Sequence, residues 1–437
     1  MKGERISRRR FVDRTVKTAA TFASISVVPS RVLAATGQAP PSEIINQAII
    51  GVGGMGMGHV DYVLNDSRSR LVAVCDVDEQ HLANGLKKAG DGCKGYRDFR
   101  EVLDRGDVDI LHVVTPPHWH ALISVAAAEA GCDIWCEKPM TRTIGECQPV
   151  VDAVQRNGRM FRLNTWFRLY GDFYGLGTTV KPLKKLVASG LLGWPLTVRV
   201  SRFTGFDWKV KMWEGRTNLV TEPVPPYFDY DMWLGPAPHK PYNPGRTHQV
   251  FRGYWDYDGG GLTDMGQHYL DPVQYFLGKD DTSPIEVEAR APWPVDTDAV
   301  GLWGQVELRY ADGCRIILES GDWGTNETEG KPYIEGPRGK VYQGFKTDPP
   351  GLVEAVASLP DPEPMVSDFV ESVKTRQKFG LNEMNGRRSN ILVHMANAAI
   401  RTGRKLRFDP ETLHFIGDDE ANRLVDQPMR APWRLTL

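Results

Sequence analysis

The stretch Ile49-Ile50-Gly51-Val52-Gly53-Gly54-Met55-Gly56 decides the fold. A short apolar run leads into a glycine turn that opens a helix, and three of the glycines have the spacing G-x-G-x-x-G. Gly51 allows the tight turn, Gly53 lets a pyrophosphate approach the backbone, and Gly56 lets the helix pack close to the sheet. The residues of this turn that we expect to contact a dinucleotide are Gly51, Gly53, Gly54, Met55 and Gly56.

A second apolar run, Leu71 to Cys75, ends at Asp76, about twenty residues after Gly56. A carboxylate at this distance accepts hydrogen bonds from the ribose hydroxyls of the adenosine half. Because it also repels a 2′-phosphate, the sequence favours NAD, although the nearby Lys87-Lys88 and Arg97 leave NADP open. The alternative interpretation is an ordinary strand-to-helix turn.

The segment from 47 to 165 alternates short apolar runs with helical patterns, which predicts a parallel sheet with helices on both faces. Ligands of such sheets bind at the carboxyl ends of the strands. The predicted strands are 47–52, 71–75, 109–115, 133–136 and 160–163. The predicted helices are 55–65, 79–89, 98–105, 118–131 and 143–157.

After residue 165 the chain is richer in glycine, proline and aromatic residues. Ala311-Asp312-Gly313 is typical of a hairpin turn. This part is expected to be an α+β domain with a largely antiparallel open sheet, one face of which could pair with a second subunit. The predicted strands are 195–203, 285–292, 301–310 and 314–321, with helical patterns in 365–403. The predicted fold class is therefore α/β, with an N-terminal Rossmann sheet and this C-terminal domain.

The first residues are typical of an export signal rather than of a folded domain. Ser7-Arg8-Arg9-Arg10-Phe11 is a twin-arginine pattern, and a mild apolar run and small residues follow it. The sequence therefore predicts a signal at 1–35, a linker at 36–46 and export to the periplasm; the alternative is a disordered basic tail. The formal charge of −2 indicates neither a nucleic-acid partner nor a membrane partner. The six cysteines are expected to be free thiols, most of them buried.

Two loops follow the predicted strands of the sheet. Thr115-Pro116-Pro117-His118-Trp119-His120 is stiffened by its prolines and could floor a nicotinamide pocket. His118 and His120 are either ligand contacts there or polar residues at a helix start. Glu137-Lys138-Pro139 places a lysine at a strand end, where it could exchange a proton with a reacting hydroxyl. The alternative is a solvated surface lysine.

A third informative stretch is Gly259-Gly260-Gly261, which precedes Asp264 and His268. The two polar residues are four apart, so they share one face of a helix. A carboxylate beside an imidazole orients it and suits a general base. A purely structural helix pair is the alternative. A metal site is not predicted, because no third ligand stands at a recognisable spacing.

Together these stretches resemble the glucose–fructose oxidoreductase / inositol dehydrogenase (Gfo/Idh/MocA) family, in particular its exported members with a twin-arginine signal. The resemblance covers essentially the whole chain after the signal. It implies a Rossmann domain at 47–165, a substrate and oligomerisation domain at 166–437, and a nicotinamide-dependent oxidoreductase of sugars, glycosides or cyclitols. The likeness also implies a homodimer or homotetramer through the C-terminal sheet.

The resemblance implies roles for individual residues. His268 would remove the hydroxyl proton, Asp264 would orient His268 and bind substrate, and Lys138 would stabilise the developing oxyanion. The implied substrate contacts are Asn164, Trp166 and Arg168. The cofactor contacts beyond the glycine turn are Asp76, Thr115, Pro116, His120, Glu137 and Lys138.

Export constrains the cofactor, because the periplasm holds no pool of free nicotinamide nucleotide. We therefore expect a tightly bound NAD that is regenerated on site, with NADP as the alternative cofactor. A redox-neutral alternative is an NAD-dependent glycosidase resembling glycoside hydrolase family 109, in which oxidation, elimination, hydration and reduction follow one another. A non-catalytic sugar-binding relative is the third alternative.

Overall fold

The computed structural model describes residues 43–172, 176–292 and 298–435. The predicted signal and the first part of the predicted linker, up to residue 42, lie outside the described residues. In the part of the chain that is described, no helix has both the length and the apolar character needed to cross a bilayer. All six cysteines lie in the described part and are free, as expected, and five of them are buried.

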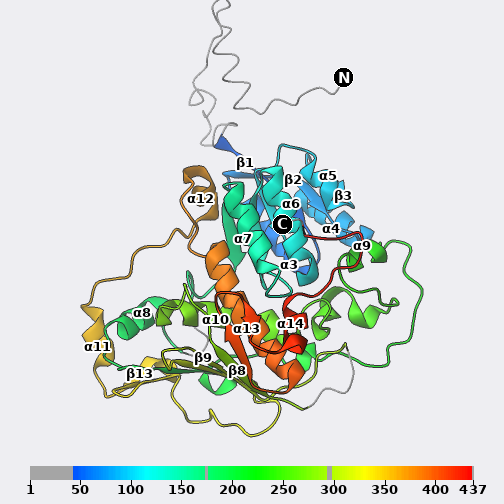
Figure 1. Ribbon diagram of the computed structural model, residues 1–437. Helices are drawn as coiled ribbons and strands as arrows, with labels where there is room; N and C mark the ends of the chain where they lie inside the picture. The colour runs from blue at the N-terminus through cyan, green and yellow to red at the C-terminus, as the bar shows by residue number, and fades with distance from the viewer. Residues whose placement is uncertain (1–42, 173–175, 293–297, 436–437) are drawn as a thin grey trace, which may run out of the picture. The chain divides into compact units, whose positions relative to one another are not determined.

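The N-terminal part forms a parallel sheet with helices packed on it (Figure 1). Its strand order among the described residues is β3-β2-β1-β4-β5-β6. The strands are β1 (Ile45–Ile50), β2 (Ser69–Cys75), β3 (Lys94–Tyr96), β4 (Ile110–Val113), β5 (Asp133–Glu137) and β6 (Phe161–Asn164). The helices are α3 (Gly54–Asn65), α4 (Glu79–Ala89), α5 (Phe99–Leu103), α6 (His120–Ala130) and α7 (Cys147–Arg156). The predicted alternation is confirmed, and only the short β3 was not foreseen.

The central strands of this sheet are buried on both faces, as expected of parallel strands covered by helices. Neighbouring residues Ala48 and Ile49 of β1 point to opposite faces and are both fully buried. Polar side chains fix the helix starts: Asp78 accepts from the backbone N–H groups at the start of α4, and Asp98 does so at α5.

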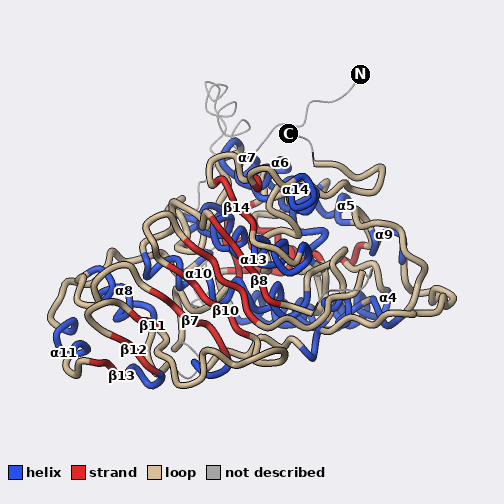
Figure 2. Tube along the Cα trace, turned by 60° about the horizontal axis from the view of Figure 1, so that its bottom comes forward, coloured by secondary structure: helices blue, strands red, loops and turns tan. Residues whose placement is uncertain are grey.

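The C-terminal part is built on a second, mixed sheet whose strands lie side by side in Figure 2. Its order is β13-β12-β11-β7-β10-β9-β8-β14-β15 among the described residues. Of its pairs, β7 with β10 is parallel and the others are antiparallel. The strands are β7 (Thr197–Ser201), β8 (Glu286–Arg290), β9 (Gln305–Arg309), β10 (Arg315–Glu319), β11 (Ile334–Glu335), β12 (Lys340–Tyr342), β13 (Lys346–Asp348), β14 (Leu406–Asp409) and β15 (His414–Phe415). The predicted hairpin joins β9 to β10 through Gly313, whose φ is +86°.

The helices of this part are α8 (Val180–Ala188), α9 (Tyr230–Leu234), α10 (Gly260–Leu277), α11 (Leu352–Ala357), α12 (Phe369–Thr375), α13 (Glu383–Thr402) and α14 (Asp419–Val425). Short 3-10 helices are η2 (Pro117–Trp119), η3 (Arg202–Thr204), η4 (Lys211–Trp213), η5 (Pro244–Arg246), η6 (His248–Gly253) and η7 (Gln343–Phe345).

Helix α10 is the central helix of the molecule. Every residue of it except Tyr275 is buried, so it has no solvent face. It packs against α13 and α8, and α13 in turn contacts β6 of the first sheet and β8 of the second. Three glycines allow its start to approach other backbone closely: a Cβ on Gly261 would lie 2.0 Å from the carbonyl oxygen of Trp208. This burial fixes the two polar residues that the sequence singled out on α10.

Candidate active site

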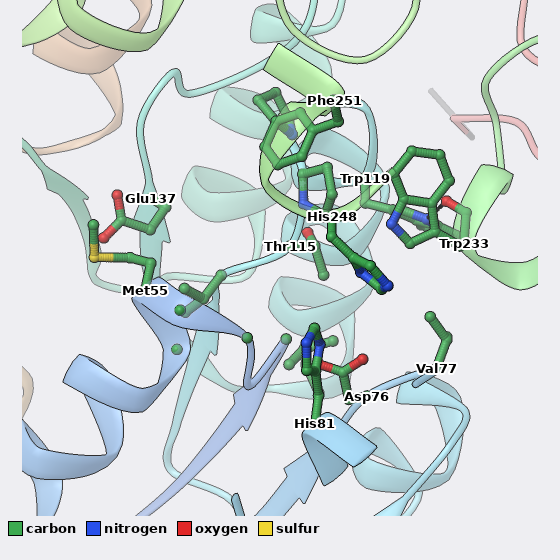
Figure 3. Close-up of a pocket in the computed structure, with 18 of the residues that line it drawn as sticks. Met55, Asp76, Val77, His81, Thr115, Trp119, Glu137, Trp233, His248 and Phe251 are labelled. Atoms are coloured by element: carbon green, nitrogen blue, oxygen red, sulfur yellow. Dashed lines mark hydrogen bonds and ion pairs between the residues drawn. The ribbon is translucent and has the colours of Figure 1, made fainter. Parts of the chain in front are cut away.

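A cavity of about 640 Å³ lies at the carboxyl ends of the parallel strands. Its walls come from the loops after β1, β2, β4 and β5, from the start of α10, and from η6. Figure 3 shows Asp76, Val77 and His81 together at one end, with Met55 and Glu137 away from them. The predicted site residues that line the cavity are Gly51, Gly53, Gly54, Met55, Gly56, Asp76, Thr115, Pro116, Glu137, Lys138 and Asp264.

The glycine turn forms an anion cradle at one wall. Gly51 has φ +90°, and a Cβ on Gly56 would lie only 2.0 Å from the carbonyl oxygen of Gly51. Helix α3 begins behind Gly53, which offers no side-chain cap, so the first N–H groups of the helix have no intrahelical acceptor. Free N–H groups at a helix N-terminus bind phosphate oxygens.

Two further groups fit a dinucleotide. Asp76 is held at the strand end by the backbone N–H groups of Val52 and Asp78, each 2.9 Å from one of its carboxylate oxygens. The hydroxyl of Thr115 lines the same cavity, is buried, and has no hydrogen-bond partner among the described residues. The cradle, the fixed carboxylate and the unpaired hydroxyl therefore fit NAD better than they fit an ordinary strand-to-helix turn.

Lys138 and Asp264 form a buried ion pair at the other end of the cavity. Lys138 Nζ lies 2.6 Å from Asp264 Oδ1 and donates to the Asp264 carbonyl oxygen at 2.7 Å. Arg252 Nε donates to Asp264 Oδ1 at 2.8 Å, and Trp213 Nε1 donates to Oδ2 at 3.0 Å. Gln267 fixes the two elements together, because it accepts from Met140 N and donates to α13.

The surroundings of Asp264 hold it ionised. Burial alone would raise the pKa of its carboxyl, but Lys138 and Arg252 outweigh burial and lower that pKa well below its usual range. A lysine held in this way presents its remaining N–H to the cavity as a fixed donor, which suits stabilisation of a developing oxyanion.

Asp258, which directly precedes the three glycines, has a raised pKa, in contrast to Asp264. It lines the same cavity and is 4% exposed, and its Oδ1 has no hydrogen-bond partner among the described residues. Burial and the charge of Asp264 raise the pKa of Asp258 to about 8, against the weaker opposing effects of Arg252 and Lys138. The site thus holds two carboxyl groups in opposite protonation states near neutral pH.

His268 differs from the expectation. It shares a face of α10 with Asp264, but no hydrogen bond joins the two among the described residues, because Asp264 is bound by Lys138, Arg252 and Trp213. The His268 ring instead stacks on Trp166, with ring centroids 4.2 Å apart. Burial and then Lys138 lower the pKa of His268 to about 3, so the ring is neutral at neutral pH.

Two other predicted residues, Arg168 and His120, have structural partners. Arg168 is 3% exposed and is bound by Asp271 at 2.8 Å and Asp280 at 2.6 Å, which corrects the expectation that it contacts substrate. His120 is buried with its ring nitrogens 2.7 Å from the Thr115 and Pro139 carbonyl oxygens; it orders the two loops rather than touching a cofactor.

Asn164 and Glu137 belong to a buried hydrogen-bond chain. Asn164 donates to Glu137 Oε1 at 2.5 Å, and the same oxygen lies 2.9 Å from His59 Nε2. His59 Nδ1 lies 2.8 Å from His112 Nδ1, and His112 Nε2 donates to Gln47 at 2.6 Å. Burial holds the pKa of His112 well below its usual value, so the neutral ring that donates to Gln47 through Nε2 accepts from His59 at Nδ1. Burial raises the pKa of Glu137, but His59 outweighs it and the pKa is about 2.

The adenosine end of the cavity carries a group that the sequence did not reveal. Ligand atoms of Asp78, His81 and His248 lie within 4.8 Å of one another, close enough to hold a metal ion. His81 Nδ1 also lies 3.7 Å from Asp76 Oδ2, and its ring lies against Gly53. This group therefore surrounds the place where the ribose of a dinucleotide would bind.

Sequence reasoning missed His248, Arg252, Trp213 and Asp258. The first three lie in a segment without regular spacing. Tertiary packing of η6 brings His248 and Arg252 to the cavity, and that of η4 brings Trp213 to Asp264. Asp258 did have a signal, since it adjoins the glycines before α10, but its burial could not be read from the sequence.

Two family models match the chain, one in each of its two parts. The family model for "Oxidoreductase family, NAD-binding Rossmann fold" matches residues 45–165. The model for "Oxidoreductase family, C-terminal alpha/beta domain" matches residues 176–435. Both models belong to one oxidoreductase family.

Two curated relatives share the N-terminal part. Inositol 2-dehydrogenase of Salmonella paratyphi B is 31% identical over 155 residues, which are 35% of this chain and 44% of that protein. A glycosyl hydrolase family 109 protein of Shewanella pealeana is 30% identical over 125 residues, 27% of each chain. The chain thus matches less than half the length of these relatives. The solved WlbA dehydrogenase from Bordetella pertussis, in complex with NADH and UDP-GlcNAcA, has the same fold, with a TM-score of 0.55, 18% identity, and coverage of 84% of this chain and 99% of that one.

Proposed function

Since the chain belongs to the Gfo/Idh/MocA oxidoreductase family, we propose that it oxidises and reduces a carbinol of a sugar, glycoside or cyclitol with a tightly bound nicotinamide cofactor. One observation carries this proposal: the Lys138–Asp264 ion pair faces the same cavity as the glycine cradle. A binding protein would have no need of a buried lysine fixed by a carboxylate beside a cofactor site.

The residues have separate roles in this proposal. The cofactor, held by the glycine turn, Asp76 and Thr115, accepts and returns hydride. Lys138 donates to the substrate oxygen as negative charge develops on it, and Asp264 holds Lys138 and Arg252 in place. The stacked rings of His268 and Trp166 are not among the residues that line the cavity, and they would contact a substrate ring that extends beyond it, since aromatic faces pack well on sugars.

The proposal includes export and cofactor retention. The twin-arginine pattern at Ser7–Val12 supports transport of a folded protein, already loaded with cofactor, into the periplasm. Retention is supported by η6, which brings His248 and Phe251 to the cavity wall. Asp76 favours NAD over NADP because its carboxylate would repel the 2′-phosphate of NADP.

We also propose domain limits and assembly. After a signal at 1–35 and a linker at 36–46, the cofactor domain would span 47–165 and the substrate domain 166–437. The outward face of β9 and β10 carries Glu307, Arg309 and Arg315, whose polar side chains suit pairing with the same sheet of a second copy.

A second candidate is redox-neutral glycoside hydrolysis with the same bound cofactor. The relative in glycosyl hydrolase family 109 favours it, as does the presence in one cavity of both an ionised and a neutral carboxyl group. Such a reaction needs no external acceptor, which suits an exported enzyme.

Mass spectrometry of products distinguishes the candidates. The purified chain is mixed with glycosides and cyclitols without added cofactor. A product that has lost two hydrogens with its glycosidic bond intact indicates oxidation. Free sugar at unchanged oxidation state indicates hydrolysis. If neither product forms while bound NAD is present, the proposed function is wrong.

A further inference from the structure

The start of α4 and the 3-10 helix η6 bring three metal-binding side chains together at the adenosine end of the cavity. Asp78 caps α4, His81 lies in the first turn of that helix, and His248 is the first residue of η6. One ligand atom from each of the three lies within 4.8 Å of the other two. Figure 3 shows His81 and His248 entering the cavity from these two elements. None of the three takes part in the chemistry assigned to Lys138 and Asp264.

Asp78 presents one carboxylate oxygen to this group. Its Oδ1 accepts from the backbone N–H groups of Gln80 at 2.8 Å and His81 at 3.2 Å, which fixes the side chain. Its Oδ2 lies 3.4 Å from His248 Nε2, which is longer than the roughly 2.7–2.9 Å of a charge-assisted hydrogen bond. Two metal–ligand bonds of about 2.1 Å that meet at a tetrahedral angle place their ligand atoms about 3.4 Å apart. The separation therefore fits two ligands of one tetrahedral metal ion better than it fits a direct ion pair.

Neighbouring residues fix the positions of the two rings. The ring centroids of His81 and His248 lie 4.9 Å apart with the planes at 60°, so the rings meet at an edge and do not stack. Phe228 packs on the His248 ring with centroids 4.9 Å apart, and its backbone forms a β-bridge with Asp78. Asp76 Oδ2 lies 3.7 Å from His81 Nδ1, and a carboxylate is a common orienting partner of a metal-binding histidine. The three ligands are thus positioned by the fold itself.

The backbone of η6 is unusual at its ligand. His248 has φ +49°, a left-handed conformation that few residues other than glycine adopt. Residues in this conformation persist where the surrounding structure holds them, and they cluster at ligand sites. The side chain of His248 is 39% exposed and that of His81 is 34% exposed, so an ion can reach the group from the cavity.

The ligand set selects the class of metal. Imidazole nitrogens together with a carboxylate suit Zn²⁺ and its first-row neighbours, whereas Mg²⁺ and Ca²⁺ prefer oxygen ligands. The tetrahedral separation favours Zn²⁺ and Co²⁺ within that class. A zinc ion with three protein ligands keeps a fourth position for water or another ligand.

We propose that Asp78, His81 and His248 form a binding site for a divalent cation of the zinc class, which ties η6 to the start of α4. The ion leaves Asp76 free for the nucleotide, because the carboxylate of Asp76 is held separately by the backbone N–H groups of Val52 and Asp78. The metal site goes beyond the proposed function and does not depend on it, since all three ligands are protein groups. The effect of the tie on cofactor retention does rest on the proposed function.

The test uses the full purified chain without an affinity tag, together with the variants D78N, H81Q and H248Q. D78N keeps an oxygen for the cap of α4, because Asn caps helices as well as Asp does. The matched control is H414Q. His414 also lies beside a carboxylate, 2.8 Å from Asp426, but it belongs to no group of three such ligands among the described residues.

The first readout is the affinity for Zn²⁺ alone, measured by titration calorimetry. The wild type should bind one Zn²⁺, and each of the three ligand variants should bind it about 100-fold more weakly or worse. Changing even a residue that only orients a metal ligand typically costs about 10- to 100-fold. H414Q should bind Zn²⁺ within twofold of the wild type, and Mg²⁺ should not compete. Co²⁺ should give the visible absorption of a low-coordinate site in the wild type and not in H248Q.

The second readout is the tie between the two elements. Backbone amides of η6 should exchange hydrogen more slowly in the wild type with Zn²⁺ than without it, and H248Q should show no difference. NAD bound to the wild type should also dissociate more slowly when Zn²⁺ is present, which a fluorescence chase measures. H248Q should release NAD at one rate under both conditions.

The outcomes separate the metal site from the proposed function. If H248Q binds Zn²⁺ as tightly as the wild type, or if H414Q loses as much affinity as H248Q, these three residues are not the site. If Zn²⁺ binds there but leaves exchange in η6 unchanged, the tie does not form and that part of the proposal is wrong. If Zn²⁺ binds and protects η6 while NAD leaves at an unchanged rate, the proposed cofactor retention fails and the metal site stands.

Discussion

Replacing Asp264 with Asn tests the charge cluster at the centre of the site. The variant keeps the shape of the side chain and an acceptor for Trp213, but it removes the carboxylate that binds the Lys138 ammonium. The Lys138 side chain is 8% exposed and that of Arg252 is 20% exposed, so water replaces the lost charge only in part. Removing one partner of a buried pair costs about 3–5 kcal/mol.

Asp258 should offset part of that cost. The charge of Asp264 helps keep Asp258 protonated, so the D264N change lowers the pKa of Asp258 and provides a new carboxylate near the two cations. We therefore expect D264N to lower the free energy of unfolding by about 3 kcal/mol at neutral pH. The pKa of Asp264 is depressed in the folded state, so its contribution is fully present above about pH 4 and is lost as pH falls below that.

The assay is urea unfolding of wild type, D264N, K138M and the double variant across pH. The double-mutant cycle should give a coupling of about 0.5–3 kcal/mol between the two residues. A D264N cost below about 1 kcal/mol, the range of an exposed ion pair, would refute the reasoning, as would a coupling near zero. A D264N cost that stayed unchanged at acid pH would contradict the assigned ionisation.

Three other predictions follow from single contacts. Gly56→Ala should abolish NAD binding, measured by fluorescence, and should destabilise the fold by about 1–3 kcal/mol, because its Cβ would lie 2.0 Å from Gly51 O. The control is Gly301→Ala, where a Cβ meets nothing within 4 Å and the residue does not line the cavity, so this variant should bind NAD normally. Asp76→Asn should lower the affinity for NAD about tenfold, which is the cost of one hydrogen bond to a charged group. In competition titrations the variant should also show a smaller ratio of NAD affinity to NADP affinity. Arg168→Met should cost about 3–5 kcal/mol by leaving Asp271 unpaired, while the KM of the folded fraction stays within twofold; a large KM change would restore Arg168 as a substrate contact.

The sequence predicted those strands and turns that depend on residues close together in the chain. The apolar runs and the glycine turn predicted five strands of the first sheet, because buried parallel strands must be apolar and the close approach at Gly56 admits no side chain. The turn Ala311-Asp312-Gly313 predicted the β9–β10 hairpin for the same reason, since Gly313 takes a positive φ. The three-residue strand β3 has too little pattern to be read.

The site residues divide in the same way. The i, i+4 spacing placed Asp264 and His268 on one face of α10 correctly, but it also suggested that they pair. Asp264 instead pairs with Lys138, 126 residues away, and with Arg252 from an irregular segment. Spacing along a helix predicts which side of the helix a residue lies on. Which partner it binds depends on the cations that the tertiary fold places beside it. Arg168 is the same case: its buried partner Asp271 lies 103 residues further along the chain.

The neutral carboxyl of Asp258 shows why this difference matters for chemistry. Asp258 and Asp264 have the same side chain and flank the same glycines, and the spacing that singles out Asp264 says nothing about the protonation state of either. The fold gives one of them three donors and leaves the other with none among the described residues. Two carboxyl groups whose surroundings move their pKa values apart can divide the work of an acid–base reaction, one as a fixed charge and one as a proton carrier.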